Sequence, residues 1–311
     1  MLNEIRSLDE LYTAFPDEKA AIDHFRTLRW PNGMACVHCG SVERVYDLKM
    51  GKHKCGDCKE KFTVRHGTIF EDSKLPLRKW YAAIFLATSH KKGVASAQLA
   101  RDLKITQKSA WHVLHRIREA TKHKSFRKPL LTGIVEMDET YVGGKPRNRH
   151  LGHRIKFTQA RSGKKIVFGM YQRDGELRLQ SVRKIADIRP IIQANVKINT
   201  AVHTDEAGHF RWMRSPYNWN LVKHSLHEYV RGDVTTNRIE GVFGHFKRSV
   251  VGVYHQMSDQ HIDRYLSLFS WRWNRREMGE GERVNAFLTS TVGHKLTYKA
   301  LIAAKDERET G

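Results

Sequence analysis

The stretch GIVEMDETYVGG, at residues 133–144, predicts a short apolar β-strand that leads into Asp138. A second aspartate, Asp205, ends another strand-like run, TAVHTD. A third acid, Glu240, lies in NRIEGVFGHFKRSV, whose apolar spacing predicts a helix. We expect the three carboxylates to meet in space, so that two strands and one helix define a single site.

The elements around these acids follow the order β-β-β-α-β-α-β-α. Asp174-Gly175 is a hairpin signal between the second and third strands. A helix is predicted over roughly 186–197, and a short helical stretch, HFRWMRS, precedes the fifth strand. The predicted strands lie in GIVEMDETYVG, KKIVFGMYQRDG, ELRLQSVRKI, TAVHTD and LVKHSLHEYV.

This order is that of the ribonuclease H-like fold, an α/β architecture in which helices flank a mixed sheet. The first and fourth strands are neighbours in that fold. We therefore expect Asp138 and Asp205 to converge, and the last helix to bring Glu240 across them.

Three carboxylates from separate elements suit divalent-metal chemistry on DNA strands. Two ions about 3.5–4 Å apart activate the attacking oxygen and stabilise the leaving oxygen of a phosphodiester. Hard ions such as Mg²⁺ or Mn²⁺ prefer carboxylate and water oxygens. Asp138, Asp205 and Glu240 are therefore candidate catalytic residues and Mg²⁺ ligands. Glu139 and Glu206 should point to the opposite side if the strands stay regular through them.

The helix around Glu240 places Asn237, Glu240, Gly244 and Lys247 on one face. Lys247 is a candidate for holding a phosphate. Gly241 and Gly244 each cost about 1 kcal/mol relative to Ala inside a helix. Two explanations stay open: close approach of a DNA backbone, or tight packing of the helix on the sheet.

The cysteines form two pairs, Cys36-x-x-Cys39 and Cys55-x-x-Cys58, with fifteen residues between them. This spacing is typical of a four-thiolate zinc ribbon with a β-hairpin that turns near Gly51. Four reduced cysteines in a small core are the alternative. A closed zinc site is structural, so it does not identify a reaction.

A helix is predicted at 76–90, followed by two helices joined at Lys104-Ile105, with Thr106 as N-cap of the last one. This pattern is typical of a helix-turn-helix, and an ordinary helical hairpin is the alternative. The exposed start of the recognition helix would be Gln107, Lys108 and Ser109.

The chain has 311 residues, with 55 Lys and Arg against 33 Asp and Glu, giving a net charge of +22. Such an excess favours a polyanionic partner, most often nucleic acid. The segment 144–165 has eight Lys and Arg and no acid, which predicts a basic loop that grips phosphate. A solvated loop is the alternative. The candidate DNA contacts are Lys145, Arg147, Arg149, Arg154, Lys156 and, after Glu240, Arg248.

The N-terminal sequence lacks a secretory signal, and no stretch approaches the roughly 20 apolar residues of a membrane span. The cysteine usage fits a reducing cytosol. We expect five regions: an N-terminal helical segment, a zinc ribbon, a helix-turn-helix domain, a ribonuclease H-like catalytic domain and a C-terminal helical appendage. Their predicted bounds are 1–30, 31–70, 74–124, 130–278 and 279–311.

The sequence resembles the bacterial insertion-sequence DDE transposases that have an N-terminal zinc ribbon, the ISXO-like group. The resemblance covers nearly the whole chain and is carried by RWPNGMACVHCG, HGTIFEDSKLPLRKW, MDETYVGGK, NRIEGVFGHFKRSVVGVYH and RYLSLFSWRWNRRE. It implies Mg²⁺-dependent transposition by a ribonuclease H-like domain, with catalytic acids at Asp138, Asp205 and Glu240 and a basic residue at Lys247. Because some relatives use Asn as the third ligand, Asn237 stays a further candidate.

The resemblance also implies partners and a location. We expect binding to the terminal inverted repeats and to target DNA, a homo-oligomer when two ends are paired, and a cytoplasmic protein on the nucleoid. Two other readings stay open: a non-enzymatic DNA-binding regulator derived from a transposase, and a nuclease of the same fold.

Overall fold

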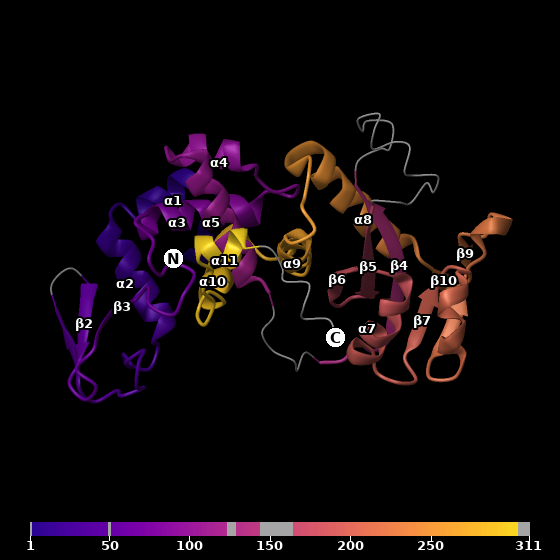
Figure 1. Cartoon of the computed structure of the whole chain (residues 1–311), viewed down its shortest axis with the longest axis horizontal. Coiled ribbons are helices and arrows are strands. Elements are labelled where there is room, and N and C mark those ends of the chain that lie inside the picture. Colours follow the sequence, from indigo (N-terminus) through magenta and orange to yellow (C-terminus); the bar gives the residue numbers. More distant parts are fainter. Residues whose placement is uncertain (1, 49–50, 123–128, 144–163, 304–311) are drawn as a thin grey trace. The chain divides into compact units, whose positions relative to one another are not determined.

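The computed structural model of the chain describes residues 2–48, 51–122, 129–143 and 164–303. It divides into two compact units (Figure 1). The first unit contains residues 1–122 and 275–311, and the second contains residues 123–274. The three candidate acids all belong to the second unit.

The first unit begins with a short 3₁₀ helix, η1 (Leu2–Glu4), and two α-helices, α1 (Leu8–Ala14) and α2 (Glu18–Arg29). The side chains of Ser7 and Asp17 cap α1 and α2 by accepting hydrogen bonds from the first turn of each helix.

A three-stranded antiparallel sheet follows, made of β1 (Val45–Asp47), β2 (Lys52–Cys55) and β3 (Lys61–Thr63). The pair β1–β2 is the hairpin predicted between the two cysteine pairs. The third strand was not predicted, and it pairs with β2 through Lys52 and Thr63.

Three helices follow β3 in this unit: α3 (Leu77–Ser89), α4 (Ser96–Leu103) and α5 (Gln107–Ala120). Helix α3 is buried along most of its length and contacts α1, α2, α4 and α5. Between α4 and α5, Lys104 has a left-handed φ of 49°, and the Thr106 side chain caps α5. The two predicted helices and the turn between them are thus present.

The last two helices, α10 (Glu280–Thr289) and α11 (Tyr298–Ile302), belong to the first unit. Helix α10 packs against η1 and α3. A Cβ at Gly281 would lie 1.7 Å from the carbonyl oxygen of Leu2, so only glycine permits this contact. The sequence alone did not show which elements these helices pack against.

The second unit is built on a five-stranded sheet in the order β6-β5-β4-β7-β8. Strand β4 is antiparallel to β5 and parallel to β7, and β7 is parallel to β8. The first and fourth strands of the unit are therefore neighbours, as predicted. The strands are β4 (Ile134–Val142), β5 (Lys165–Gln172), β6 (Leu177–Val182), β7 (Ala201–Thr204) and β8 (Asn218–Leu221).

Helices cover both faces of this sheet. One face packs against α8 (Asn237–Ser249) and α9 (Ile262–Trp273). The other packs against α7 (Ile188–Asn195) and the 3₁₀ helix η5 (Gly208–Arg214). The prediction of a mixed sheet flanked by helices is confirmed.

The predicted position of the fifth strand is wrong. That strand is β8, which lies before most of the expected segment 221–230. The expected segment instead forms a 3₁₀ turn, η6 (His224–Leu226). It then enters a short hairpin whose two strands, β9 (Val230–Arg231) and β10 (Val234–Thr235), have two residues each. Strand β8 ends at Leu221, and at His227 the backbone has a left-handed φ of 57°, which is incompatible with one continuous strand over 221–230.

Two short helices complete the described elements: η4 (Ile185–Asp187) leads into α7, and a π-helical turn, η7 (Val250–Tyr254), extends α8. Within the residues that the structure describes, no helix combines the length and apolar character needed to cross a membrane.

Candidate metal centre and acid cluster

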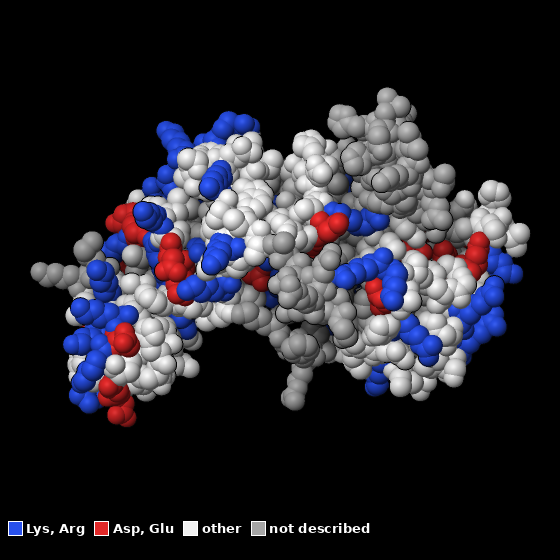
Figure 2. Space-filling model, in the orientation of Figure 1, with Lys and Arg blue, Asp and Glu red and all other residues white. Residues whose placement is uncertain are grey.

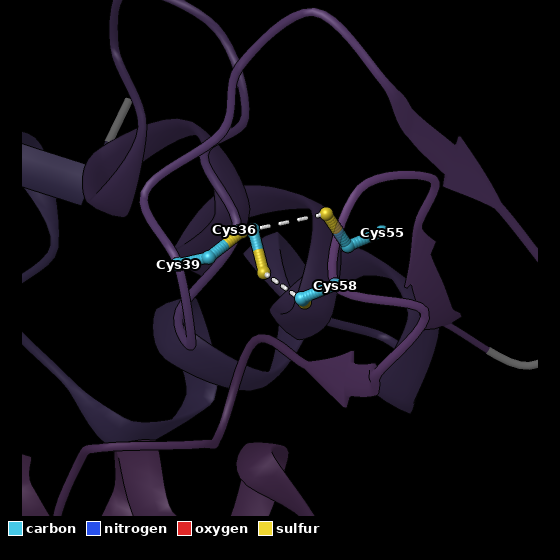
Figure 3. A group of neighbouring side chains, drawn as sticks. All are labelled: Cys36, Cys39, Cys55 and Cys58. Carbon is cyan, nitrogen blue, oxygen red and sulfur yellow. Dashed lines mark hydrogen bonds between the residues drawn. The ribbon is translucent and has the colours of Figure 1, made fainter.

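The four predicted zinc ligands converge on one point (Figure 3). Their sulfur atoms all lie within 4.8 Å of one another. The Sγ atoms of Cys36 and Cys58 are 3.6 Å apart, and those of Cys39 and Cys55 are also 3.6 Å apart. A tetrahedral site with Zn–S bonds of about 2.3 Å places its sulfur atoms about 3.8 Å apart. The arrangement therefore fits a structural Zn²⁺ ion.

The thiols of Cys55 and Cys58 have pKa values shifted in opposite directions. Backbone hydrogen bonds, first from Cys58 and then from Asp57, lower the pKa of Cys55 to about 6. A backbone hydrogen bond from Glu60 acts in the same direction on Cys58, but burial and the neighbouring sulfur atoms outweigh it and raise the pKa of Cys58 to about 12. Four thiolates this close need a bound cation to stay ionised together.

Asp138 lies on the sheet face that α8 covers. Side chains alternate along a strand, so Asp138 shares a face with Glu136. The Glu136 carboxylate accepts hydrogen bonds from the backbone N–H groups of Arg238 and Ile239, at the start of α8. Asp138 therefore faces the helix that carries Glu240.

Gly169 on β5 explains how α8 packs so closely here. It is the direct cross-strand partner of Asp138. A Cβ at this position would lie 2.8 Å from Ile239 Cδ1 and 2.9 Å from Phe243 Cζ, both on α8. The missing side chain therefore admits the helix next to Asp138, a role that sequence reasoning did not assign to this glycine.

Burial and neighbouring acids disfavour the ionised form of Asp138. Burial first, and then the charges of Glu139, Asp205 and Glu240, raise the pKa of Asp138 to about 8. Burial also raises the pKa of Asp205, and the Glu139 charge adds to this effect. Asp205, after β7, and Glu240, on α8, thus lie close enough to Asp138 to disfavour its ionisation, as does the neighbouring Glu139.

Glu240 is held by its own helix and by η6. Thr236 Oγ1 donates a hydrogen bond to Glu240 Oε1 at 2.6 Å. His224 Nε2 lies 3.7 Å from the same oxygen, and the His224 charge opposes the rise in the pKa of Asp205. His224 therefore interacts with two of the acids, although sequence reasoning placed it in a strand.

The acids that follow the two aspartates make different contacts. Glu139 Oε2 lies 3.3 Å from His209 Nε2 in η5, on the sheet face opposite to Asp138. Glu206 Oε1 accepts a hydrogen bond from Ser225 N at 2.9 Å. Strand β7 ends at Thr204, so the assumption of a regular strand does not extend through Asp205 and Glu206.

Asp138, Asp205 and Glu240, called the acid cluster below, are less tightly grouped than the four cysteines. Across the described ranges, the four cysteines form the only group of three or more His, Cys, Asp or Glu side chains whose ligand atoms all lie within 4.8 Å. Carboxylates that raise one another's pKa repel when ionised, and a divalent cation offsets that repulsion. The donors of the cluster are hard oxygens, so it fits Mg²⁺ or Mn²⁺ better than a thiophilic ion.

The outer face of α8 is open around Gly241 and Gly244. A Cβ at Gly241 would meet no described atom within 4 Å, and one at Gly244 would meet only Arg248 Nη1, at 3.7 Å. Tight packing on the sheet is thus wrong as an explanation for these glycines. Close approach of a DNA backbone stays a prediction; Asn237 and Lys247 are exposed near them.

We expect Gly241→Ala and Gly244→Ala each to raise the free energy of unfolding by up to about 1 kcal/mol, because Ala favours the helix and nothing opposes its Cβ. Gly169→Val is the contrasting variant, since the added side chain collides with α8 and should cost about 1–3 kcal/mol. Urea denaturation followed by circular dichroism measures all three. A clear loss of stability in either alanine variant would contradict this description of α8.

The raised pKa of Asp138 makes stability depend on pH. The folded protein holds this proton more tightly than the unfolded chain, whose Asp has a pKa near 3.8. Without added divalent ions, stability should therefore fall as pH rises from about 4 to about 8. Denaturation of the wild type and of Asp138→Asn at several pH values measures the effect. The difference between them should change by up to about 1.4 kcal/mol per pH unit, and a constant difference would contradict the prediction.

The predicted DNA-reading residues differ in their surroundings. Gln107, Lys108 and Ser109 are exposed at the start of α5, and Lys108 Nζ lies 4.8 Å from the ring centroid of Tyr298 in α11. Arg248 is exposed near the end of α8. The predicted contacts that lie outside the described residues are Lys145, Arg147, Arg149, Arg154 and Lys156.

Positive side chains are prominent on both units. In the view of Figure 2, Lys and Arg exceed Asp and Glu on the visible surface of each unit. This distribution agrees with the net charge of +22. The positive charge therefore belongs to folded surfaces and is not confined to one segment.

Comparisons with known proteins agree with these observations. Residues 130–274 match the ISXO2-like transposase domain, and residues 16–61 match the transposase zinc-ribbon domain. A relative from Halobacterium salinarum, "Uncharacterized protein in transposable element ISH50", is 27% identical over 274 residues, which cover 83% of this chain and 91% of the relative. Residues 130–274 therefore belong to the ISXO2-like transposase domain family, and residues 16–61 belong to the transposase zinc-ribbon family.

A solved structure is also similar in part: the simian T-cell lymphotropic virus intasome in complex with PP2A regulatory subunit B56 gamma. The match is 12% identical, covers 60% of this chain and 64% of that chain, and has a TM-score of 0.26. A likeness of this size supports no inference.

Proposed function

We propose that this transposase binds the ends of its insertion sequence and cuts and joins DNA strands at Asp138, Asp205 and Glu240, with divalent metal ions. The observation that supports the proposal is that acids from separate elements disfavour ionisation of Asp138. After burial, the charges of Glu139, Asp205 and Glu240 all raise its pKa, and β4 pairs in parallel with β7, directly after which Asp205 follows. A fold gains no stability from such repulsion, so a role in binding cations is the simplest reason for it.

The strand order supports a ribonuclease H-like catalytic domain. Three antiparallel-paired strands are followed by a helix and then by a strand that is parallel to the first. The first strand and the end of the fourth then lie side by side, where Asp138 and Asp205 occur. We propose bounds of 130–278 for this domain, after a zinc ribbon at 31–70 and a helix-turn-helix at 74–124.

Asp138, Asp205 and Glu240 would hold Mg²⁺ or Mn²⁺. Bound there, these ions would activate the attacking oxygen and stabilise charge on the leaving oxygen of a phosphodiester. Thr236 holds the Glu240 carboxylate in place through its 2.6 Å hydrogen bond. Asn237 lies at the first position of the same helix and is a further candidate ligand.

The outer face of α8 would carry the DNA strand toward the acids. Lys247 and Arg248 are exposed there and would pair with phosphates, while Gly241 and Gly244 leave room for the backbone. In the first unit, Gln107, Lys108 and Ser109 would contact bases at the transposon ends. The predicted contacts in the basic segment 144–165 would add salt-sensitive phosphate contacts; they are Lys145, Arg147, Arg149, Arg154 and Lys156.

The proposal includes two further expectations. Two ends must be paired before joining, so the working form would be at least a dimer of this chain. The protein would act in the cytoplasm, on the DNA of the nucleoid.

The test uses the purified chain, Mg²⁺ and DNA from the regions that flank its gene, which should contain the inverted repeats. The proposal predicts cleavage at the ends and joined products with a target plasmid. Cleavage without joining would favour a nuclease of the same fold. Tight, specific binding without Mg²⁺-dependent cleavage would favour a DNA-binding regulator.

A further inference from the structure

Glu136 lies two residues before Asp138 on β4, and its side chain is fully buried. Both carboxylate oxygens are used. Oε1 accepts a hydrogen bond from Arg173 Nε at 2.9 Å. Oε2 accepts from the backbone N–H groups of Arg238 at 3.0 Å and Ile239 at 3.2 Å. The side chain is thus fixed from two sides.

The bonds to Oε2 provide hydrogen-bond acceptors for backbone N–H groups in the first turn of α8. The first N–H groups of a helix have no partner within the helix. Thr236 occupies the N-cap position but makes no side-chain capping bond, and its hydroxyl donates to Glu240 instead. Glu136 provides the cap from a strand 102 residues earlier in the chain, and its negative charge meets the positive end of the helix dipole.

Arg173 extends the connection to the segment before α8. Its Nη1 donates to Asp233 Oδ1 at 2.6 Å, and its Nη2 donates to the Asp233 carbonyl oxygen at 2.9 Å. Asp233 lies in the turn between β9 and β10, from which the chain enters α8. Glu136 and Arg173 together therefore hold both the approach to the helix and its first turn.

We propose that Glu136 is a positioning residue that fixes α8 relative to β4 and thereby sets how strongly the acid cluster binds a divalent cation. The inference rests on the proposed metal-binding function. Its basis is proximity along the chain: Ile239 precedes Glu240 directly, and Glu136 precedes Asp138 by two residues. The Glu136 carboxylate thus connects β4, which carries Asp138, to the start of α8, which carries Glu240. It is not itself a proposed ligand.

A purely structural ion pair predicts a different result. In that case, loss of the carboxylate would lower stability, and cation affinity would change only through unfolding. The two roles are separated by measuring cation binding on protein that is shown to be folded. Outer partners that orient metal ligands typically change affinity by 10–100-fold when replaced.

The experiment compares wild type, Glu136→Gln and Glu136→Asp, with Glu176→Gln as the matched control. Glu176 also pairs with an arginine of this sheet, Arg178, whose other hydrogen bonds go to Asn195 of α7 and to the Pro129 carbonyl oxygen. Isothermal titration with Mn²⁺, corrected with Asp138→Asn, measures affinity at the acid cluster, and circular dichroism reports folding. We expect about 10–100-fold weaker Mn²⁺ binding in both Glu136 variants and no change in the control.

A second readout needs no metal. Hydrogen exchange of the Arg238 and Ile239 amides should be slow in the metal-free wild type, because Glu136 accepts a hydrogen bond from each. In Glu136→Gln, exchange should become fast at each amide that loses its bond. Fast exchange in the wild type would overturn the inference, and so would a folded Glu136→Gln with wild-type Mn²⁺ affinity. If the wild type bound no Mn²⁺ at this cluster, the proposed function would fail, and this inference with it.

Discussion

Replacement of Asp138 by Asn is expected to lower Mg²⁺-dependent DNA cleavage at least ~10³-fold, because metal ions supply several kcal/mol of transition-state stabilisation. Asn keeps the shape of the side chain but removes its charge. The protein should stay folded, because burial and the surrounding acids already disfavour the ionised Asp138 and raise its pKa to about 8. Rates of end cleavage at saturating DNA, with thermal melting in parallel, measure the effect.

The matched control is Glu139→Gln, which removes the neighbouring acid. Glu139 lies 3.3 Å from His209 Nε2, on the other face of the sheet, so we expect cleavage within about tenfold of wild type. Equal losses in the two variants would contradict the assignment of faces. Wild-type cleavage by Asp138→Asn would contradict the site itself.

Replacement of Cys55 by Ser is expected to release one equivalent of zinc and to unfold the ribbon between residues 31 and 70. Cys55 is fully buried, and backbone hydrogen bonds favour its thiolate form. Structural Zn²⁺ contributes on the order of 10–16 kcal/mol in small domains, more than the few residues of β1 to β3 gain from packing. Zinc content by mass spectrometry and limited proteolysis measure the outcome.

His38→Gln is the control for the zinc prediction. His38 lies between Cys36 and Cys39 in the first pair, and its replacement leaves all four sulfur ligands. We expect zinc content to be unchanged in this variant. Zinc loss from His38→Gln, or full zinc retention by Cys55→Ser, would show that the four cysteines are not the ligand set.

Much of the fold of the second unit follows from local sequence patterns. Alternating apolar residues and the Asp174-Gly175 turn predicted β4, β5 and β6 correctly. The order of elements then implied that β4 and β7 are neighbours, which the parallel pairing confirms. The fifth strand was misplaced because 221–230 has strand-like residues, whereas β8 ends at Leu221 and the chain then forms η6 and a left-handed residue at His227.

Other features depend on contacts between distant residues, so local patterns could not reveal them. Gly169 has no unusual φ, and its role appears only when α8 packs over it. Glu136 was a signal that sequence reasoning passed over, since it is a charged residue between the apolar Val135 and Met137. Its partners at the start of α8, Arg238 and Ile239, are more than 100 residues away and could not be named from the sequence.

For the helices after residue 279, too, local sequence patterns do not identify the packing partner. Val284, Phe287 and Leu288 have helical spacing, which indicates a buried face. Periodicity does not identify what covers that face, and the partners are η1 and α3 at the other end of the chain. Burial could be predicted here, but the packing partner could not.

The central claim is that Asp138, Asp205 and Glu240 surround one cation site. It is tested most directly by loading the protein with Fe²⁺ and adding ascorbate and peroxide, so that radicals cut the chain next to the bound ion. We predict cuts near all three residues, suppressed together by excess Mg²⁺ and by Asp138→Asn. Cuts near only one of the three, or cuts that neither treatment suppresses, would contradict the claim.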